Sequence, residues 1–408
     1  MKNSEKQNVI PVLLGADLGA YSMAVSFAEC GIRPSFAFAR DKLAISSTSS
    51  IIRSRVVREL DECNTAVPAL IEFARESKGE RLILVPCADW YVEMLQYARD
   101  TLSGHYFFMI PPFEVWRAVS DKASFYYVLD TYKIPHPKTE IFDIEIKDLQ
   151  KRGEVLKPPF VVKPSDSSEY YRHKFEGMKK VYFAHSLSEA EAIMRKIYSN
   201  GYGGKMLLQE LIGSGKARAS VLTVFIGSDG RVKRAVLGDV ALEETSPTAR
   251  GNYSAIITRP LDAISYKLIN MLEGIGYRGF ANFDILHDDT ESYCLELNPR
   301  QGRSFDYTRG AKMEAAQLLV NEMLSTPSSE ILSYPEYLWR AVGKTTAFKN
   351  SSSDYLAKKG RLLEEMGASY TPFDSGVDGG FLRKLYVGAH LYRCERSFKR
   401  DMARKEII

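Results

Sequence analysis

The sequence predicts a mixed α/β protein that starts with an open parallel sheet. Three observations support this fold class. Residues 8–39 read as strand, glycine turn, helix and strand, which is how a βαβ unit begins. Apolar, strand-like segments then alternate with helical segments as far as Pro112. Further along, residues 279–297 read as two strands joined by a polar turn, which indicates a hairpin.

Two breaks in this pattern divide the chain into three expected parts. Pro111-Pro112 marks the first boundary, and the Ser/Thr/Pro-rich stretch 325–329 marks the second. We therefore expect an α/β domain over 1–112, a second α+β domain over 113–329, and a basic, mainly helical appendage over 330–408. The chain has 408 residues, 45% of them hydrophobic, which is enough for two or three domains with cores of their own.

Composition narrows the classes of function. The net charge of +4 permits an anionic substrate but gives no reason to expect nucleic-acid binding. The five cysteines are scattered without a Cys-x-x-Cys pair, which predicts reduced thiols and a cytoplasmic location. The first eight residues do not follow a signal-peptide pattern. Asp17 and Glu29 interrupt the apolar stretch 9–32, so we expect no membrane span there.

The first domain offers two candidate ligand contacts. Gly15 and Gly19 lie in the turn after the first predicted strand. They could cradle a phosphate at a helix N-terminus, but they do not complete a dinucleotide fingerprint, and a purely structural turn is the other interpretation. Asp89 is expected at the C-terminal end of a strand, which is the edge where open sheets bind ligands.

The predicted hairpin carries the residues around which a site is expected. Glu296 and Asn298 share a face because side chains two positions apart on a strand point the same way, and the hairpin can bring Asp284 beside them. Two carboxylates and an amide oxygen are donors that suit Mg²⁺. Arg300 and Arg303 follow directly, and guanidinium groups bind carboxylate and phosphate oxygens. The combination is typical of phosphoryl transfer, although charged residues on such strands are more often simply solvated.

Two lysines upstream are candidates for contacts with an anion. Lys163 lies in the apolar strand 160–163, where a lysine costs free energy unless an anion pairs with it. Lys122 lies in a helix predicted over 113–132 and could equally be a surface lysine.

The run Leu295–Arg300 resembles the metal-binding signature of the ATP-grasp superfamily, in which an acidic residue precedes the glutamate by twelve positions, as Asp284 does here. The continuation Gln301–Ser304 resembles more narrowly the ATP-dependent carboxylate–amine ligases of the D-aspartate ligase group. The superfamily resemblance covers residues 115–324. It implies an ATP-grasp fold, with two α+β subdomains that sandwich ATP, preceded by the open parallel domain.

The resemblance also implies roles for individual residues. The cofactors would be ATP and Mg²⁺, or Mn²⁺ in its place, and the metal ligands would be Asp284, Glu296 and Asn298. The residues that contact ATP would be Lys122, Lys163, Gln209, Glu210, Leu211 and Ile212. The catalytic residues would be Arg300, Arg303 and Lys163. The candidate substrate contacts are Arg303, Ser304, Arg250 and Asn252, of which the last two lie in a stretch that could also be a plain surface loop. Residues 165–177 would form a mobile lid over the phosphates.

The partners implied are a small carboxylate and an amine acceptor. In the narrower group these would be D-aspartate and the lysine side chain of a UDP-linked cell-wall peptide precursor. The basic segment 382–405 would suit the diphosphate of such a precursor, could lie on an anionic membrane surface, or could be a solvated helix face. Two alternatives stay open: a ligase for another amino acid or dipeptide, and a non-catalytic nucleotide-binding regulator.

Overall fold

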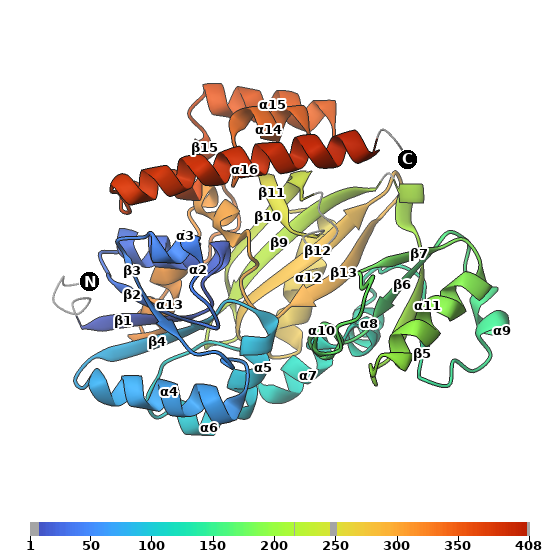
Figure 1. Cartoon of the computed structure of the whole chain (residues 1–408), viewed down its shortest axis with the longest axis horizontal. Coiled ribbons are helices and arrows are strands. Elements are labelled where there is room, and N and C mark those ends of the chain that lie inside the picture. The colour runs from blue at the N-terminus through green and yellow to red at the C-terminus, as the bar shows by residue number, and fades with distance from the viewer. Residues whose placement is uncertain (1–7, 216, 245–250, 406–408) are drawn as a thin grey trace.

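The protein is described here from a computed structural model, which covers residues 8–215, 217–244 and 251–405. Three sheets form its framework (Figure 1). Among the described residues, no helix is long and apolar enough to cross a membrane.

The N-terminal sheet is open and parallel, as expected. Its strand order is β3-β2-β1-β4, with β1 (Val9–Leu14), β2 (Ser35–Ala39), β3 (Ile52–Val56) and β4 (Arg81–Pro86). The helices that connect and follow these strands are α2 (Leu18–Glu29), α3 (Ala44–Ser47), α4 (Cys63–Glu76), α5 (Asp89–Tyr97) and α6 (Arg99–Leu102). The side chain of Asp17 caps α2 by accepting a hydrogen bond from the backbone N–H of Ala20. The C-terminal strand ends, including the residues just before Asp89, therefore meet at one edge of this sheet.

The segment expected to be one helix over 113–132 is two helices, α7 (Phe113–Ser120) and α8 (Lys122–Thr131). The break falls at Asp121, whose extended backbone cannot continue a helix and whose carboxylate accepts a hydrogen bond of 2.8 Å from the N–H of Ser124. Lys122 is therefore the first residue of a new helix rather than a residue in the middle of one.

A small antiparallel sheet follows, with the strand order β5-β8-β6-β7. Its strands are β5 (Thr139–Phe142), β6 (Phe160–Pro164), β7 (Tyr182–Ala184) and β8 (Met206–Glu210), and its helices are α9 (Leu149–Gly153), α10 (Ser167–Arg172) and α11 (Leu187–Ser199). The stretch expected as a mobile lid contains α10, because Asp166 caps that helix by accepting from the N–H of Glu169.

The large sheet has the order β13-β12-β9-β10-β11-β14-β15. Its strands are β9 (Arg218–Ile226), β10 (Val232–Glu243), β11 (Tyr253–Arg259), β12 (Gly279–His287), β13 (Ser292–Asn298), β14 (Leu338–Arg340) and β15 (Ser369–Tyr370). The associated helices are α12 (Ala263–Gly274), α13 (Ala315–Met323), α14 (Lys344–Lys349), α15 (Asp354–Glu365) and α16 (Phe381–Lys405), with short 3-10 helices at Ile212–Gly215, Phe305–Ala311 and Pro372–Asp374. Helix α16 lies across the face formed by the N-terminal domain and β10–β11 (Figure 1). The C-terminal segment thus supplies the expected helices and also two strands of the large sheet.

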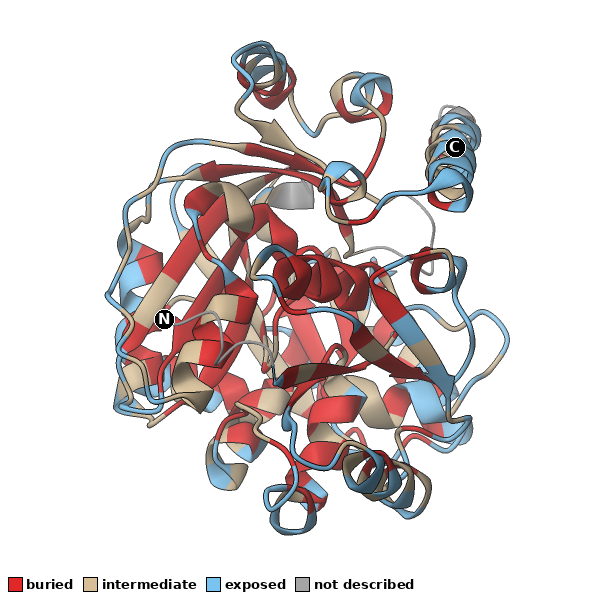
Figure 2. Cartoon of the chain, turned by 90° about the vertical axis from the view of Figure 1, so that its left-hand side faces the viewer, coloured by how far each residue is buried: buried red, intermediate tan, exposed pale blue. Residues whose placement is uncertain are grey.

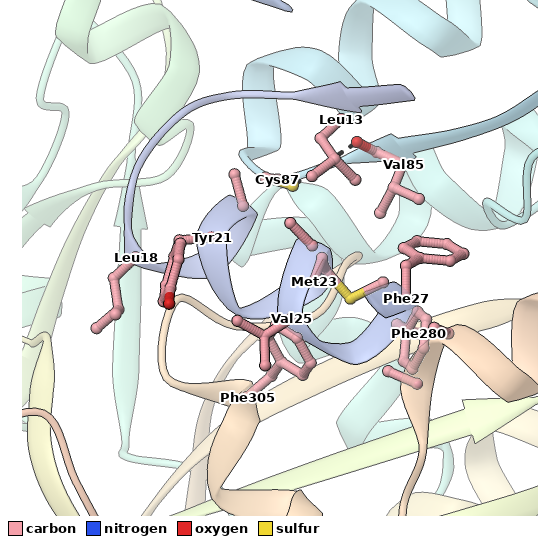
Figure 3. Packing of buried hydrophobic residues seen from close by; sticks show 14 of the residues in the cluster. Leu13, Leu18, Tyr21, Met23, Val25, Phe27, Val85, Cys87, Phe280 and Phe305 are labelled. Atoms are coloured by element: carbon pink, nitrogen blue, oxygen red, sulfur yellow. Dashed lines mark hydrogen bonds between the residues drawn. The ribbon is translucent and has the colours of Figure 1, made fainter. Parts of the chain in front are cut away.

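The N-terminal sheet and the large sheet share one hydrophobic core. Helix α2 lies between them: Leu13 and Val85 of the first sheet flank it on one side, and Phe280 and Phe305 contact it from the other (Figure 3). The buried interior runs through both layers, whereas α16 is largely exposed (Figure 2). This shared core fixes the strand ends of the first domain against the hairpin β12–β13.

Candidate active site

A pair of carboxylates marks the centre of the site. Asp284 on β12 lies directly opposite Glu296 on β13, and Asn282 lies opposite Asn298 in the same ladder. The ladder shifts its register just after Asp284, so the hairpin is irregular at this pair. The hydroxyl of Tyr253 donates a hydrogen bond of 3.0 Å to Asp284 Oδ1.

Lysine side chains surround Glu296. Its Oε2 lies 3.2 Å from the Nζ of Lys122, and its Oε1 lies 3.5 Å from the Nζ of Lys180. Lys122 also donates a hydrogen bond of 2.9 Å to Ser167 Oγ on α10. The two ammonium groups neutralise a carboxylate that would otherwise be buried unpaired.

The charges of this cluster shift the pKa values of its members in opposite directions. Burial alone would raise the pKa of Glu296, but the positive charges of Lys180, Lys122 and Lys163 outweigh it and hold that pKa well below its usual range. Burial, together with the negative charge of Glu296, raises the pKa of Asp284 to about 7. Glu296 therefore carries the fixed negative charge of the pair.

Lys163 is held in the interior of the small sheet. Its side chain comes from β6, and the residue is only 8% exposed. Its Nζ donates a hydrogen bond of 3.3 Å to the hydroxyl of Tyr126, which in turn donates to the carbonyl of Leu295. Burial lowers the pKa of Lys163 to about 8, despite the opposing effect of Glu296. A buried ammonium without a carboxylate at contact distance is suited to receive an anion.

The cluster of Glu296 with Lys122 and Lys180 opens onto a cavity of about 430 Å³, and neither Lys163 nor Asp284 is among the described residues that line it. Its wall includes Lys122, Lys180, Glu296, Asn298 and Arg300. Positive groups and carboxylates thus face one space, which is the arrangement needed for a polyphosphate and a divalent cation.

The predicted adenine contacts lie at the end of β8, next to this region. Gln209 donates hydrogen bonds to Tyr126 and Thr139, and Glu210 accepts one of 3.1 Å from the N–H of Lys157. Leu211 and Ile212 follow and are half-buried. None of the four is among the described residues that line the cavity of about 430 Å³. The predicted hinge therefore lies outside the lining of the cavity but beside Lys163, because Gln209 and Lys163 both donate hydrogen bonds to the hydroxyl of Tyr126.

The predicted metal ligands fit a divalent cation in their chemistry. Asp284 and Glu296 present two carboxylates across the hairpin, and Asn298 adds an amide on the same strand. In this structure the ammonium groups of Lys122 and Lys180 neutralise the charge of Glu296, as a bound divalent cation would also do. Within residues 8–215, 217–244 and 251–405, no group of three or more His, Cys, Asp or Glu side chains could hold a metal ion, so the metal prediction depends on the amide of Asn298 as the third ligand.

The two predicted catalytic arginines each pair with a carboxylate. Arg300 Nη2 lies 2.7 Å from Oδ2 of Asp89, the residue predicted at the ligand-binding edge of the first sheet. Arg303 Nη1 lies 3.2 Å from Oε1 of Glu244. Arg300 Nε and Asp89 Oδ1 are buried and have no hydrogen-bond partner among the described residues. The Arg300–Asp89 pair therefore has unused hydrogen-bonding capacity, with which it can bind a ligand.

A second cavity, of about 480 Å³, continues from the first. Asp89, Asn252 and Arg300 line both. Its other walls come from the glycine turn at Gly15 and from Arg303. Ser304, which follows Arg303 in the sequence, is buried. Arg250, the other predicted substrate contact, lies outside the described residues.

Lys180 and Tyr126 belong to the site but are not among the residues that the sequence predicts for it. Lys180 lies in a loop before β7, and nothing in its neighbourhood distinguishes it from the adjacent Lys179. Tyr126 follows Lys122 by one helical turn, a spacing that places both on one face of α8, and this was a usable signal.

Comparisons with known proteins agree with this geometry. The chain is 32% identical over 311 residues to D-aspartate ligase of Enterococcus faecium (strain Aus0004), covering 74% of each chain. No family model matches.

Solved structures share the fold at low sequence identity. The biotin carboxylase domain of 2-oxoglutarate carboxylase from Hydrogenobacter thermophilus matches with a TM-score of 0.63 and 15% identity, covering 81% of this chain and 73% of that one. N5-carboxyaminoimidazole synthetase from Staphylococcus aureus matches with a TM-score of 0.60 and 12% identity, covering 83% of each. The fold, the carboxylate–lysine cluster and the sequence relative together assign the chain to the ATP-grasp superfamily, among the ADP-forming carboxylate–amine ligases to which D-aspartate ligase belongs.

Proposed function

We propose that the chain joins D-aspartate to the lysine side chain of a UDP-linked cell-wall peptide precursor, using MgATP. The observation that carries the proposal is the 32% identity to D-aspartate ligase over 74% of both chains. The second cavity supports it chemically. Arginines (Arg40, Arg300, Arg303) and aspartates (Asp17, Asp41, Asp89) share its wall, and a mixed set of this kind complements an amino acid that carries both carboxylates and an ammonium group.

The reaction would proceed in two steps. A carboxylate oxygen of the acid attacks the γ-phosphorus of ATP, and the bond to ADP breaks, which gives an acyl phosphate and ADP. An uncharged amine then attacks the acyl carbon, inorganic phosphate leaves with the bonding electron pair, and the nitrogen gives up one proton. Positioning and charge neutralisation, rather than a protein nucleophile, would lower the barrier.

The residues of the first cavity, together with the buried Lys163 and Asp284 next to it, would serve the phosphates. Lys122, Lys163 and Lys180 would hold phosphate oxygens, and Arg300 would stabilise the charge on the group in transfer. Asp284, Glu296 and Asn298 would hold Mg²⁺ or Mn²⁺, which when bound neutralises phosphate charge. Arg303, with Ser304 and Asn252, would orient the acid. Gln209 to Ile212 would contact the base of ATP.

The location that suits this reaction is the cytoplasm, where ATP is available. None of the five cysteines, all of which lie among the described residues, forms a disulfide, which fits a reducing compartment.

The decisive experiment measures ADP release across a matrix of acids and amines. We expect turnover to need ATP, D-aspartate and a lysine-containing cell-wall peptide together. In Glu296→Gln we expect a loss of about 10²-fold or more, by analogy with the removal of one charge-stabilising group. Glu291→Gln, in the exposed turn of the same hairpin, is the matched control and should keep full activity. Full activity in Glu296→Gln, or turnover with another acid in preference to D-aspartate, would contradict the proposal.

A further inference from the structure

A third cavity, of about 480 Å³, lies beneath α16. One wall is apolar and comes from α3 and the segment after β14, including Ile45 and Val342. The helix supplies the other wall through one face, on which His390, Arg393 and Ser397 project. We call this space the α16 chamber. Its volume is in the range of sites that bind small ligands or part of a larger one.

The helix that covers the chamber is fixed at its beginning. Arg383 is 2% exposed, and its Nη1 donates a hydrogen bond of 2.6 Å to the carbonyl of Ile45 on α3. Its guanidinium group lies 4.0 Å from the ring centroid of Tyr21 on α2 and 3.3 Å, measured from Nε, from Oδ2 of Asp378. Further along, Phe398 is 4% exposed and packs in a hydrophobic cluster with Leu242. Buried contacts of Arg383 and Phe398 therefore hold α16 in place on both sides of the residues that line the chamber.

The chamber continues into the cavity that we assign to the acid. Asp17, Leu43 and Arg303 line both spaces. Since Asp89, Asn252 and Arg300 connect that second cavity to the first, the three cavities form a series. A molecule in the α16 chamber would approach the acyl group from the side opposite ATP.

Two carboxylates and two guanidinium groups line the chamber, and among the described residues only the guanidinium of Arg393 has no carboxylate at contact distance. Arg303 pairs with Glu244, and the carboxylate of Asp17 caps α2. Arg393 is exposed and forms no ion pair among the described residues. Burial and the positive charges of Arg393, Arg303 and Arg383 lower the pKa of His390 to about 4, so the ring is neutral at physiological pH. Cys394, with a raised pKa, also stays uncharged. The chamber thus combines an apolar wall with a free positive group.

We propose that the α16 chamber binds the amine acceptor, and that Arg393 holds an anionic group of that acceptor while its amine reaches towards Arg303. This inference rests on the proposed function, because it needs an acyl phosphate in the second cavity. The anion could be the C-terminal carboxylate of a peptide or the diphosphate of a nucleotide-linked precursor, and guanidinium binds both.

The test separates the two half-reactions. Wild type with ATP, D-aspartate and hydroxylamine, but no peptide, should form the hydroxamate, because hydroxylamine traps the acyl phosphate directly. Arg393→Glu should leave this hydroxamate formation unchanged. With a lysine-containing peptide it should raise the acceptor KM by about tenfold or more, which is the scale of one lost charged hydrogen bond. Arg396→Glu makes the same charge change on the same helix, outside the lining of the chamber, and should leave both reactions unchanged.

Three acceptors distinguish the anions: a peptide with a free C-terminal carboxylate, the same peptide amidated, and the peptide in its UDP-linked form. An Arg393→Glu effect that disappears on amidation assigns the carboxylate, and one seen only with the UDP-linked form assigns the diphosphate. Both results support the inference.

Unchanged KM values for all three acceptors would overturn the inference, as would an equal effect of Arg396→Glu. If those KM values are unchanged and both variants lose sedimentation with phosphatidylglycerol vesicles, the helix is a membrane contact instead. Absence of hydroxamate in the wild type would overturn the proposed function itself, whereas hydroxamate formation with no change in KM would overturn this inference alone.

Discussion

The burial of Lys163 suits this residue to bind an anionic ligand. Its strand buries it, and its ammonium group donates a hydrogen bond to the hydroxyl of Tyr126 rather than to a carboxylate. The desolvation that lowers its pKa to about 8 leaves a substantial fraction of the side chain uncharged at mildly alkaline pH. An incoming phosphate would restore the charge, so anion binding and proton uptake should be coupled at this position.

The pH dependence of ATP binding follows from that coupling. A bound polyphosphate raises the pKa of Lys163 above its value of about 8 in the free protein, so affinity should fall as the pH rises above about 8, where Asp284 is already largely ionised, by up to about tenfold per unit. Calorimetric titration with MgATP between about pH 8 and pH 9 measures this fall, and buffers of different ionisation enthalpy report the proton uptake. Lys163→Arg should bind with little change over the same range, because arginine stays charged. Equal affinity in the wild type across the range would contradict the coupling.

Residue spacing predicted part of the site and missed the rest for physical reasons. A two-strand hairpin determines which residues face each other, so the positions of Asp284 and Glu296 predicted that they would meet, and the structure pairs them. Arg300 and Asp89 are 211 positions apart, and their contact depends on how the segment after β13 packs against the N-terminal sheet. Lys180 reaches Glu296 from a loop whose path no local pattern determines. Local geometry was predictable, whereas contacts between distant segments were not.

At the scale of elements, α16 shows that a charged residue in the sequence is not always an exposed one in the structure. A run of basic residues usually marks a solvated face, and most of this helix is indeed exposed. Arg383 is the exception, since it is buried against Tyr21 and paired with Asp378. Nothing in the basic run distinguishes it from its neighbours, because the partner that buries it lies near the other end of the chain.

Loss of Arg383 should loosen α16. Arg383→Ala leaves the buried carboxylate of Asp378 without its cation, which we expect to destabilise this contact by about 3 kcal/mol or more. Limited proteolysis should then cleave within or before α16 under conditions in which the wild type is intact, and Tm should fall. Lys399→Ala, which removes an exposed ion pair with Glu395 from the same helix, is the control and should change stability by less than about 1 kcal/mol. Equal protease resistance of Arg383→Ala and the wild type would show that the buried pair does not hold the helix.

At the scale of the whole molecule, the segment after residue 329 is part of the central framework. The sequence predicted its helices, but β14 and β15 comprise only three and two residues, too short for an alternating pattern to reveal. β14 pairs with β11, and Trp339 is fully buried in the core that the N-terminal sheet and the large sheet share. The division into 1–112, 113–329 and 330–408 stays a prediction, although the third part cannot be removed without exposing a strand edge and a core residue.

Two truncations test this organisation. A chain that ends after residue 380 keeps all seven strands of the large sheet and should fold, form the hydroxamate and lose peptide acceptance. A chain that ends after residue 329 lacks β14 and β15, uncovers β11, and should aggregate or stay unfolded. Circular dichroism and size-exclusion chromatography distinguish the two. Cooperative unfolding of the shorter chain would show that the third part is an independent appendage.

The contact between Arg383 and Ile45 also has a consequence for synthesis of the protein. Its two residues are 338 positions apart, so the contact that covers Tyr21 from this side can form only after the segment that carries Arg383 has been synthesised. The α16 chamber comes into being only after translation has passed Phe398. A chain without α16 would then hold ATP and the acid without a place for the acceptor, so the capacity to complete the reaction would depend on a segment that is synthesised after the residues of the other two cavities.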